Sequence, residues 1–311
     1  MTTGFVHEAL FYDSPDEYVA GLVPFLTEGL AAGHPVAAAV PEPNLSLLRD
    51  ALGEDASRVH LLDMGVAGRN PGRIIPHVLR DFADRHPDAA RVRIIGEPIW
   101  AWRSAVEYPA CAQHEALINP AFEGRDVTIV CPYDTNALDP VAIADARVTH
   151  PLVTERGVQR DSDTYAWEDL VARYNDELKP AADAVTFRVE VPDELSTARR
   201  TFAAHAREQG LDEDRTEDLK LILTELATNS LLHAGTPCEL SLWREGGELV
   251  CSATDGGRLA DLLAGRRPPR RGQLSGRGLL LVNDLADLVR THRAPDGTTI
   301  QVRLRLGEKP L

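Results

Sequence analysis

The stretch Glu225-Leu-Ala-Thr-Asn229-Ser-Leu-Leu-His233 is the most informative part of this chain. A carboxylate, a carboxamide and an imidazole recur there at every fourth residue, so one face of an α-helix would carry all three. The surrounding pattern predicts a helix from Asp214 to the residue before Gly235, with a buried apolar stripe beside these polar groups. Asparagine inside a helix is disfavoured by up to roughly 0.7 kcal/mol relative to alanine, so Asn229 needs a small justification, which a metal–phosphate site would provide. Taken alone, the pair Glu225 and Asn229 is more often a solvated polar edge of a helix.

A predicted hairpin follows this helix. Two alternating runs, Glu239–Arg244 and Glu248–Thr254, are joined across a pair of glycines, which is typical of strands linked by a tight turn. The second run leads to Asp255, and a further glycine pair ends at Gly257. A carboxylate at a strand end can accept a hydrogen bond from an amino group of adenine, and a glycine would let the base approach the backbone. By itself, the same pattern is also compatible with an ordinary turn.

The last predicted helix has a glycine-flanked start. Gly276-Arg277-Gly278 precedes the apolar run Leu279–Leu288, and the N-terminal amides and dipole of such a helix attract phosphate. Residues 258–271 contain five arginines and two prolines, which suits a cover that reaches phosphates, although a solvated loop is the alternative. The other elements predicted in this half are a helix at Leu195–Gln209 and strands at Val185–Val191, Val289–His292 and Thr298–Leu306, with a turn at Gly297.

The first half alternates short apolar runs with amphipathic stretches. This alternation predicts a mainly parallel sheet covered by helices, an α/β sandwich. The predicted strands are Val6–Tyr12, Pro35–Val40, Val59–Leu62, Val92–Ile95 and Val127–Cys131. The predicted helices are Asp16–Ala32, Leu45–Leu52, Pro71–Arg85 and Ala112–Asn119, the last ending before Pro120.

Polar residues follow several of these strands. Because ligands of open α/β sheets bind outside the carboxyl ends of the strands, we expect a pocket built from Glu97, Tyr133 and Asp134, with His114 nearby. Ordinary turn chemistry is the alternative and the more common explanation for such residues. This half contains neither a Gly-x-x-x-x-Gly-Lys-Ser/Thr loop nor a Gly-x-Gly-x-x-Gly after a strand, so it lacks a recognisable phosphate cradle.

The composition narrows the range of partners. The chain has 311 residues and a formal net charge of −15, which argues against electrostatic binding to nucleic acid or to an anionic membrane. No apolar run reaches the roughly 18 residues of a membrane span, and the start lacks a signal-peptide pattern, so we expect a cytoplasmic protein. The four cysteines stand singly, and His114-Glu115 has Ile118 where a zinc helix needs a second histidine, so the sequence predicts no metal site there.

The first half resembles the MEDS sensory domain over roughly residues 4–155. The resemblance rests on His7-Glu-Ala-Leu-Phe-Tyr12, Gly96-Glu97-Pro98-Ile-Trp100, His114-Glu115-Ala-Leu-Ile-Asn119 and Cys131-Pro132-Tyr133-Asp134. It implies a ligand-sensing module with a nucleotide-binding-like core of Rossmann or RecA type without a phosphate loop. The small-molecule ligand is not defined by this resemblance.

The second half is similar to the GHKL ATPases over about residues 184–308. Glu225-x-x-x-Asn229, Asp255-x-Gly257, Gly276-x-Gly278 and Gly297-Thr298 occur in the order of the N, G1, G2 and Gly-Thr boxes of that superfamily. The resemblance implies a Bergerat α/β sandwich with a mixed sheet, binding ATP with Mg²⁺. Asn229 would hold Mg²⁺, Asp255 the adenine, and Glu225 would be the general base. The expected nucleotide-binding residues are Asn229, His233, Asp255, Gly257, Gly276, Arg277, Gly278, Leu279 and Thr298.

Within that superfamily the compact layout is similar to the anti-sigma-factor serine kinases. Two departures are Leu259, where many members have a second glycine, and the arginine- and proline-rich cover. A histidine kinase is not indicated, because His205 and His150 lack the acidic neighbour and spaced proline of an acceptor helix. We expect residues 1–155 to form the sensory domain, 156–183 a linker with a helix at Tyr165–Leu178, and 184–311 the ATPase domain.

The sequence thus predicts a sensory domain that controls a serine/threonine kinase acting on an antagonist protein, with a sigma factor as a further partner. A homodimer is expected from the family resemblance. One alternative is a switch in which ATP alters affinity for a partner without phosphate transfer. A metabolic enzyme centred on Glu97, His114 and Asp134 is a third interpretation.

Overall fold

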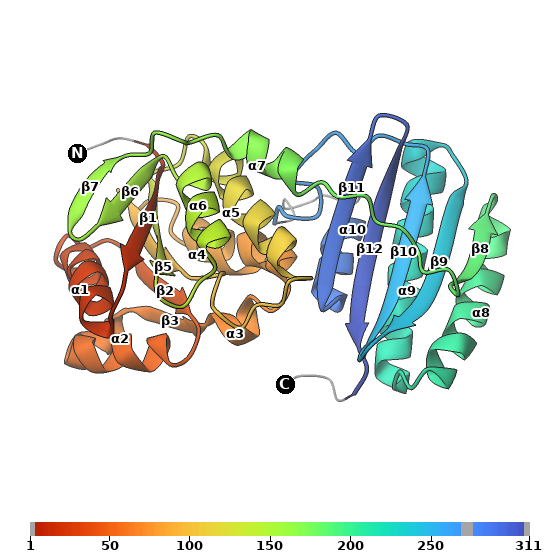
Figure 1. The fold of residues 1–311 in the computed structure, drawn as a ribbon, viewed down its shortest axis with the longest axis horizontal. Helices are drawn as coiled ribbons and strands as arrows, with labels where there is room; N and C mark the ends of the chain where they lie inside the picture. The colour runs from red at the N-terminus through yellow and green to blue at the C-terminus, as the bar shows by residue number, and fades with distance from the viewer. Residues whose placement is uncertain (1–3, 269–275, 308–311) are drawn as a thin grey trace. The chain divides into compact units, whose positions relative to one another are not determined.

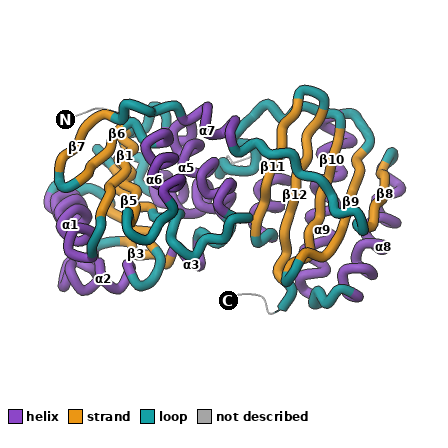
Figure 2. Tube along the Cα trace, viewed as in Figure 1, coloured by secondary structure: helices purple, strands orange, loops and turns teal. Residues whose placement is uncertain are grey.

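The chain forms two compact units, Met1–Tyr174 and Asn175–Leu311 (Figure 1). The computed structural model describes residues 4–268 and 276–307. Each unit combines one sheet with helices (Figure 2), as the predicted α/β organisation requires. The helices within these described ranges include none that is long and apolar enough to cross a membrane.

The N-terminal unit contains a seven-stranded sheet in the order β3-β2-β4-β5-β1-β6-β7. All neighbouring strands are parallel except for β6 and β7, which form an antiparallel pair at one edge. The mainly parallel α/β sheet predicted from the sequence is therefore confirmed. The strands are β1 (Val6–Tyr12), β2 (Val36–Val40), β3 (His60–Asp63), β4 (Val92–Gly96), β5 (Val127–Asp134), β6 (Leu152–Glu155) and β7 (Val158–Asp161).

Two helical predictions in this unit need correction. The predicted helix Pro71–Arg85 is a succession of 3₁₀, π and α turns, because Pro76 has no N–H to continue an α-helical ladder. The other predicted helix does not stop before Pro120. Asn119 Nδ2 donates to the Ala116 carbonyl at 3.1 Å and thereby satisfies the acceptor that Pro120 cannot serve.

The helices of the N-terminal unit pack around this sheet. Its core includes apolar residues of α1 and α2 together with residues of β1, β2, β4 and β5. The helical elements are α1 (Pro15–Ala31), α2 (Asn44–Leu52), η1 (Gly53–Arg58), α3 (Met64–Ala67), η2 (Pro71–Arg73), η3 (Ile74–Leu79), α4 (Arg80–Asp84), α5 (Tyr108–Phe122), α6 (Pro140–Thr149) and α7 (Trp167–Arg173).

Much of the segment expected to be a linker belongs to the N-terminal unit. Residues 152–161 form the β6–β7 hairpin of its sheet. Helix α7 is shorter than the predicted helix and is held by buried Gln113, whose Nε2 donates to the carbonyls of Val171 at 3.3 Å and Tyr174 at 3.1 Å. The polar composition of this segment did not reveal these contacts, because a hairpin at the edge of a sheet is itself polar. All four residues of β7, for example, are exposed.

The C-terminal unit contains a five-stranded sheet in the order β11-β12-β10-β9-β8. Every neighbouring pair is antiparallel, so the expectation of a mixed sheet in this unit was wrong. The crossover through α10 makes β11 run in the direction of β10, but β12 lies between them and pairs with both. The strands are β8 (Val185–Val189), β9 (Cys238–Glu245), β10 (Glu248–Asp255), β11 (Leu288–Ala294) and β12 (Gly297–Arg305).

Helices α8, α9 and α10 lie together on one face of this sheet (Figure 1). Apolar residues from these helices and from the strands share one buried core. The helical elements are η4 (Pro192–Glu194), α8 (Leu195–Glu208), α9 (Glu213–Asn229), η5 (Ser230–Ala234) and α10 (Gly278–Leu285). The helix predicted to end at Gly235 does so with that glycine at φ 66°, but its last turn, η5, is a π-helix.

A buried ion-pair network ties α9 to the far side of this core. Arg215 is 3% exposed, and its guanidinium contacts the Asp218 carboxylate at 2.9 Å and the Leu285 carbonyl at 2.7 Å. It also pairs with Asp287, which is 2% exposed and accepts a hydrogen bond from the backbone N–H of Arg305 at 2.8 Å. This arrangement satisfies a buried cation and a buried anion together.

We predict that Arg215→Ala destabilises the C-terminal unit by about 3–5 kcal/mol, because Asp287 then stays buried without its partner. The exposed Arg200 of α8 provides a control, and Arg200→Ala should change the free energy of unfolding by less than about 0.5 kcal/mol. Urea unfolding combined with hydrogen exchange of α9 and β12 measures both variants. Equal stability of the two variants would contradict the network's importance.

Candidate functional site

A cavity of about 930 Å³ opens in the C-terminal unit. It lies between the end of α9, the end of β10, the start of α10 and β12, elements that are far apart in the sequence. Nine of the residues predicted to bind nucleotide line it: Asn229, His233, Asp255, Gly257, Gly276, Arg277, Gly278, Leu279 and Thr298. The fold therefore gathers the four sequence motifs around one space.

Glu225 also lies beside this cavity, because it is in close contact with Gly278. A methyl group added at position 278 would overlap Glu225 Oε2 and lie 3.5 Å from both amide atoms of Asn229. The first turn of α10 thus approaches the polar face of α9 so closely that a side chain at position 278 would displace the carboxylate. The half-buried Glu225 and Asn229 stand side by side at the start of a helix whose N-terminal amides favour anions.

Asp255 is held in a fixed orientation at the end of β10. Its Oδ1 accepts a hydrogen bond from the Gly257 backbone N–H at 2.7 Å. Its Oδ2 accepts from the Ser230 hydroxyl at 2.6 Å. Each carboxylate oxygen keeps a further lone pair, so the group can still accept a hydrogen bond from a ligand amino group.

The glycine turn after Asp255 is braced by its neighbours. The Thr298 hydroxyl donates to the Gly257 carbonyl at 2.8 Å and accepts from the Leu259 backbone N–H at 3.1 Å. Thr298 is 6% exposed and its hydroxyl therefore serves the shape of the loop. A methyl group at position 257 would overlap the Cβ of Ala234, so the turn also packs tightly against the end of η5.

The π turn changes the position predicted for His233. The sequence predicts one continuous α-helix to Gly235, whereas His233 lies in the π turn η5. His233 is exposed and lines the cavity. Its sequence spacing placed it near the other motifs, and the structure brings it to the same cavity.

The described part of the predicted arginine-rich cover borders the cavity. Arg258 and Arg267 line it, and Arg267 forms an ion pair with Asp261. Asn283 of α10 anchors this segment, because its Nδ2 donates to the Gly265 carbonyl at 3.1 Å and to the Leu279 carbonyl at 3.0 Å. Two arginines of the predicted cover, at positions 270 and 271, lie outside the described residues.

Two residues that position the site were missed by sequence reasoning. Ser230 fixes Asp255, and Asn283 fixes the base of the cover. Ser230 directly follows Asn229 and was treated only as part of the motif. Asn283 stands in an otherwise apolar helix, and that contrast was a usable signal for a buried polar contact.

The residues expected to form a pocket in the N-terminal unit have different surroundings. Asp134 Oδ1 accepts hydrogen bonds from the backbone N–H groups of Asn136 at 2.9 Å and Ala137 at 3.1 Å, which is the turn role offered as the alternative. Tyr133 is 1% exposed and its ring meets that of His150 edge-on. His114 is fully buried within α5.

Glu97 is a buried carboxyl group at the end of β4. Asn44 Nδ2 donates to its two oxygens at 2.9 Å and 3.0 Å, and Tyr18 donates its hydroxyl to Oε2 at 3.2 Å. Burial raises the pKa of Glu97 to about 8, and the nearby Asp134 carboxylate acts in the same direction. Burial thus favours the protonated form of Glu97, against the hydrogen bonds from Asn44 and Tyr18, which favour the ionised form.

Comparison with known families assigns both units. Residues 6–151 match the MEthanogen/methylotroph, DcmR Sensory domain (MEDS), and residues 190–304 match the histidine kinase-like ATPase domain. The fusion predicted from the sequence motifs is thereby confirmed. No curated protein matches this chain.

Two solved structures show weak similarity. The RsbU and RsbW domains of Rv1364c from Mycobacterium tuberculosis are 16% identical, with a TM-score of 0.31; the match covers 40% of this chain and 32% of that one. The SiaB–SiaC complex from Pseudomonas aeruginosa is 13% identical, with a TM-score of 0.33 and coverage of 39% and 88%. The chain thus spans about a third of the length of the first of these structures, and neither superposition adds to the domain assignment.

We predict that Gly257→Ala destabilises the C-terminal unit by about 1–3 kcal/mol, because the added methyl group meets Ala234 in a tightly packed turn. The adjacent Gly256 is the matched control, since a methyl group there would make only ordinary contacts with Thr236, the nearest at 3.5 Å. Urea unfolding of both variants tests this. A larger loss for Gly256→Ala would refute the proposed packing constraint.

A second prediction concerns Glu97→Gln. Unfolded Glu97 loses its proton near pH 4.5 whereas the folded group keeps it to about pH 8, so wild-type stability should fall between these values relative to the variant. The difference should grow by up to about 1.4 kcal/mol per pH unit and level off above pH 8. Unfolding free energies at several pH values measure it, with the exposed Glu54→Gln as control. A difference that does not depend on pH would argue against a protonated Glu97.

Proposed function

We propose that this chain, which joins a MEDS domain to a histidine kinase-like ATPase domain, is a signalling regulator whose C-terminal unit binds Mg·ATP and phosphorylates a serine or threonine of an antagonist protein. The observation that carries the proposal is the close approach of Gly278 to Glu225 and Asn229 at the edge of the 930 Å³ cavity. This approach sets a carboxylate and a carboxamide beside a helix start suited to phosphate.

The residues around the cavity can take the roles in ATP binding that the family resemblance implies. Asp255 keeps lone pairs for the adenine amino group, and the Gly257 backbone N–H holds the carboxylate in place. The amide nitrogens at the start of α10 and the Arg277 side chain suit the phosphates. The carboxamide oxygen of Asn229 would hold Mg²⁺, which when bound neutralises phosphate charge.

Glu225 is proposed to be the general base for phosphate transfer. Its carboxylate would take the proton of the acceptor hydroxyl as the hydroxyl oxygen bonds to the γ-phosphorus. The bond from that phosphorus to the β–γ bridging oxygen breaks, and ADP leaves. Glu225 is half-buried and next to Asn229 across Gly278, a position from which one group can serve the acceptor while the other serves the phosphates.

The proposed partners are an antagonist protein that accepts the phosphate and a sigma factor. This partner class comes from the resemblance of the Glu225-x-x-x-Asn229 motif and its compact context to anti-sigma-factor serine kinases. The net charge of −15 fits protein and small-molecule partners better than nucleic acid. A homodimer and an unidentified small-molecule ligand of the N-terminal unit complete the proposal.

The second candidate function is an ATP-dependent switch without phosphate transfer. Leu259 at the position of a second glycine, and the Asp261–Arg267 ion pair at the cavity edge, favour it, because both features can hold the loop in one conformation. In that case nucleotide binding alone would change the affinity for the partner.

We predict that Asn229→Ala weakens Mg·ATP binding by about tenfold or more, which corresponds to at least about 1.4 kcal/mol. The loss should be much smaller without Mg²⁺, because the proposed carboxamide contact acts through the metal. Calorimetric titration of the full chain measures it, with Asn175→Ala as an asparagine control away from the cavity. Unchanged Mg·ATP binding by Asn229→Ala would show that the Asn229 carboxamide is not part of the nucleotide site.

Glu225→Gln separates the two candidate functions. If Glu225 is the base, this variant should bind Mg·ATP nearly as well as wild type but transfer phosphate to the partner about 10²–10⁴-fold more slowly. Transfer from labelled ATP to a co-purified partner measures the rate. ATP-dependent complex formation with no transfer by the wild type would establish the switch instead.

A further inference from the structure

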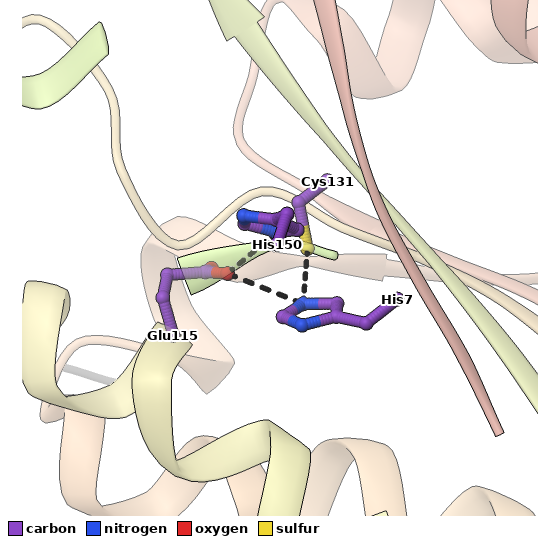
Figure 3. A group of neighbouring side chains, drawn as sticks. All are labelled: His7, Glu115, Cys131 and His150. Atoms are coloured by element: carbon purple, nitrogen blue, oxygen red, sulfur yellow. Dashed lines mark hydrogen bonds and ion pairs between the residues drawn. The ribbon is translucent and has the colours of Figure 1, made fainter. Parts of the chain in front are cut away.

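Four buried side chains meet in the N-terminal unit although they come from four different elements (Figure 3). His7 lies on β1, Glu115 on α5, Cys131 on β5, and His150 directly after α6. Their potential ligand atoms all lie within 4.8 Å of one another, and none of the four residues is more than 1% exposed. We refer to them as the His7–His150 quartet.

The hydrogen bonds around the quartet fix the tautomer of His7. Asn119 uses its Nδ2 to donate to the carbonyls of Ala116 at 3.1 Å and Thr149 at 2.9 Å. Its Oδ1, 3.2 Å from His7 Nδ1, is therefore an acceptor. Nδ1 of His7 must carry the proton, which leaves a lone pair on Nε2 when the ring is neutral.

His150 has the same tautomer for the same reason. Its Nδ1 lies 2.8 Å from the carbonyl oxygen of Ala146, which can only accept. The proton of the neutral ring is thus on Nδ1 and the lone pair on Nε2. Orientation of a histidine by a carbonyl or amide oxygen on its outer nitrogen is the arrangement found around metal-ligating histidines.

Both lone pairs point at the carboxylate of Glu115. Its Oε2 lies 3.2 Å from His150 Nε2 and 3.5 Å from His7 Nε2. A carboxylate oxygen and two imidazole nitrogens attract one another at these distances only with a positive charge among them, supplied by a proton on one of the rings or by a bound metal ion.

The geometry differs from that of a Cys–His–Glu proton relay. In such a relay the cysteine and the carboxylate address opposite nitrogens of the imidazole. Here Cys131 Sγ lies 3.6 Å from the same His7 Nε2 that faces Glu115. The single lone pair of His7 Nε2 cannot take a proton from Cys131 while the same nitrogen faces Glu115. The ligands of a central metal ion, by contrast, would all point inward in this way (Figure 3).

Three of the six separations within the quartet are close to the edges of a tetrahedron around zinc, and all six are within 4.8 Å. Nitrogen and oxygen ligands at about 2.0–2.1 Å and a sulfur at about 2.3 Å from Zn²⁺ are separated from one another by roughly 3.3–3.6 Å. These three separations are 3.2 Å from Glu115 to His150, 3.5 Å from Glu115 to His7 and 3.6 Å from Cys131 to His7. A thiolate and a carboxylate also balance the two positive charges, so the filled site would be neutral in a buried environment.

We propose that the His7–His150 quartet is a binding site for one Zn²⁺ ion, coordinated by His7 Nε2, Glu115 Oε2, Cys131 Sγ and His150 Nε2. Binding releases the Cys131 thiol proton to solvent as the sulfur–metal bond forms. Four protein ligands fill a tetrahedral shell, which is the closed type of site that stabilises structure. The ion would link β1 and β5 to α5 and to the end of α6, so metal occupancy would control the stability of this unit independently of the nucleotide site.

The first experiment measures metal in the full chain expressed with and without added zinc. We expect about one zinc per chain from supplemented cells by elemental mass spectrometry, and a higher thermal stability of the N-terminal unit in that sample. Chain produced with Co²⁺ in place of zinc should show the visible bands of a tetrahedral site and a near-ultraviolet thiolate-to-cobalt band. Chain without metal from supplemented cells, with unchanged stability, would overturn the proposal.

Variants then test the ligands. Cys131→Ala should lower zinc affinity by about 10²-fold or more in competition with a chromophoric chelator and abolish the thiolate-to-cobalt band. Cys111→Ala is the matched control, because Cys111 is also a fully buried cysteine, on α5, outside the quartet. Equal zinc retention by the two variants would show that metal binds elsewhere. If Cys131→Ala does not fold, the cobalt spectrum of the wild-type chain still decides whether a thiolate is a ligand.

Discussion

The absence of a side chain at position 278 is the constraint on which the C-terminal site depends. It lets the first turn of α10 lie against Glu225 and Asn229 of α9, where any methyl group would overlap the Glu225 carboxylate. A helix start and a polar helix face are thereby held together without an intervening side chain. The approach places the Glu225 carboxylate and the Asn229 carboxamide beside a helix start whose amides favour anions.

Around that contact, the site is made rigid by neighbours rather than by the motif residues themselves. Ser230 fixes Asp255, Thr298 braces the turn at Gly257, and Asn283 holds the base of the cover. Each of these groups satisfies a buried or half-buried polar atom, so the loops keep a defined shape at little energetic cost. A binding site of this type needs such support because its recognition groups lie at element ends, where the backbone is least constrained.

The two units differ in where their polar residues lie relative to the hydrophobic core. In the C-terminal unit the polar side chains stand at the edge of the core and face an open cavity. In the N-terminal unit the His7–His150 quartet and Glu97 are enclosed within it. An enclosed polar group must be satisfied by its neighbours, and Asn44, Asn119 and the Ala146 carbonyl provide these contacts.

The sequence by itself determined five strands of the first unit and the hairpins of the second, because hydrophobic periodicity and glycine turns are local properties, and its resemblance to the GHKL ATPases indicated the four motifs of the candidate site. It could not determine the antiparallel pairing of β12 between β10 and β11, the π turn at Ser230–Ala234, or the continuation of α5 through Pro120. Nor could it bring His7 and His150 together, since they are far apart in the chain and each has an ordinary local context. Only the tertiary structure decided those features, because they depend on which groups remain to be packed or hydrogen-bonded once distant elements meet.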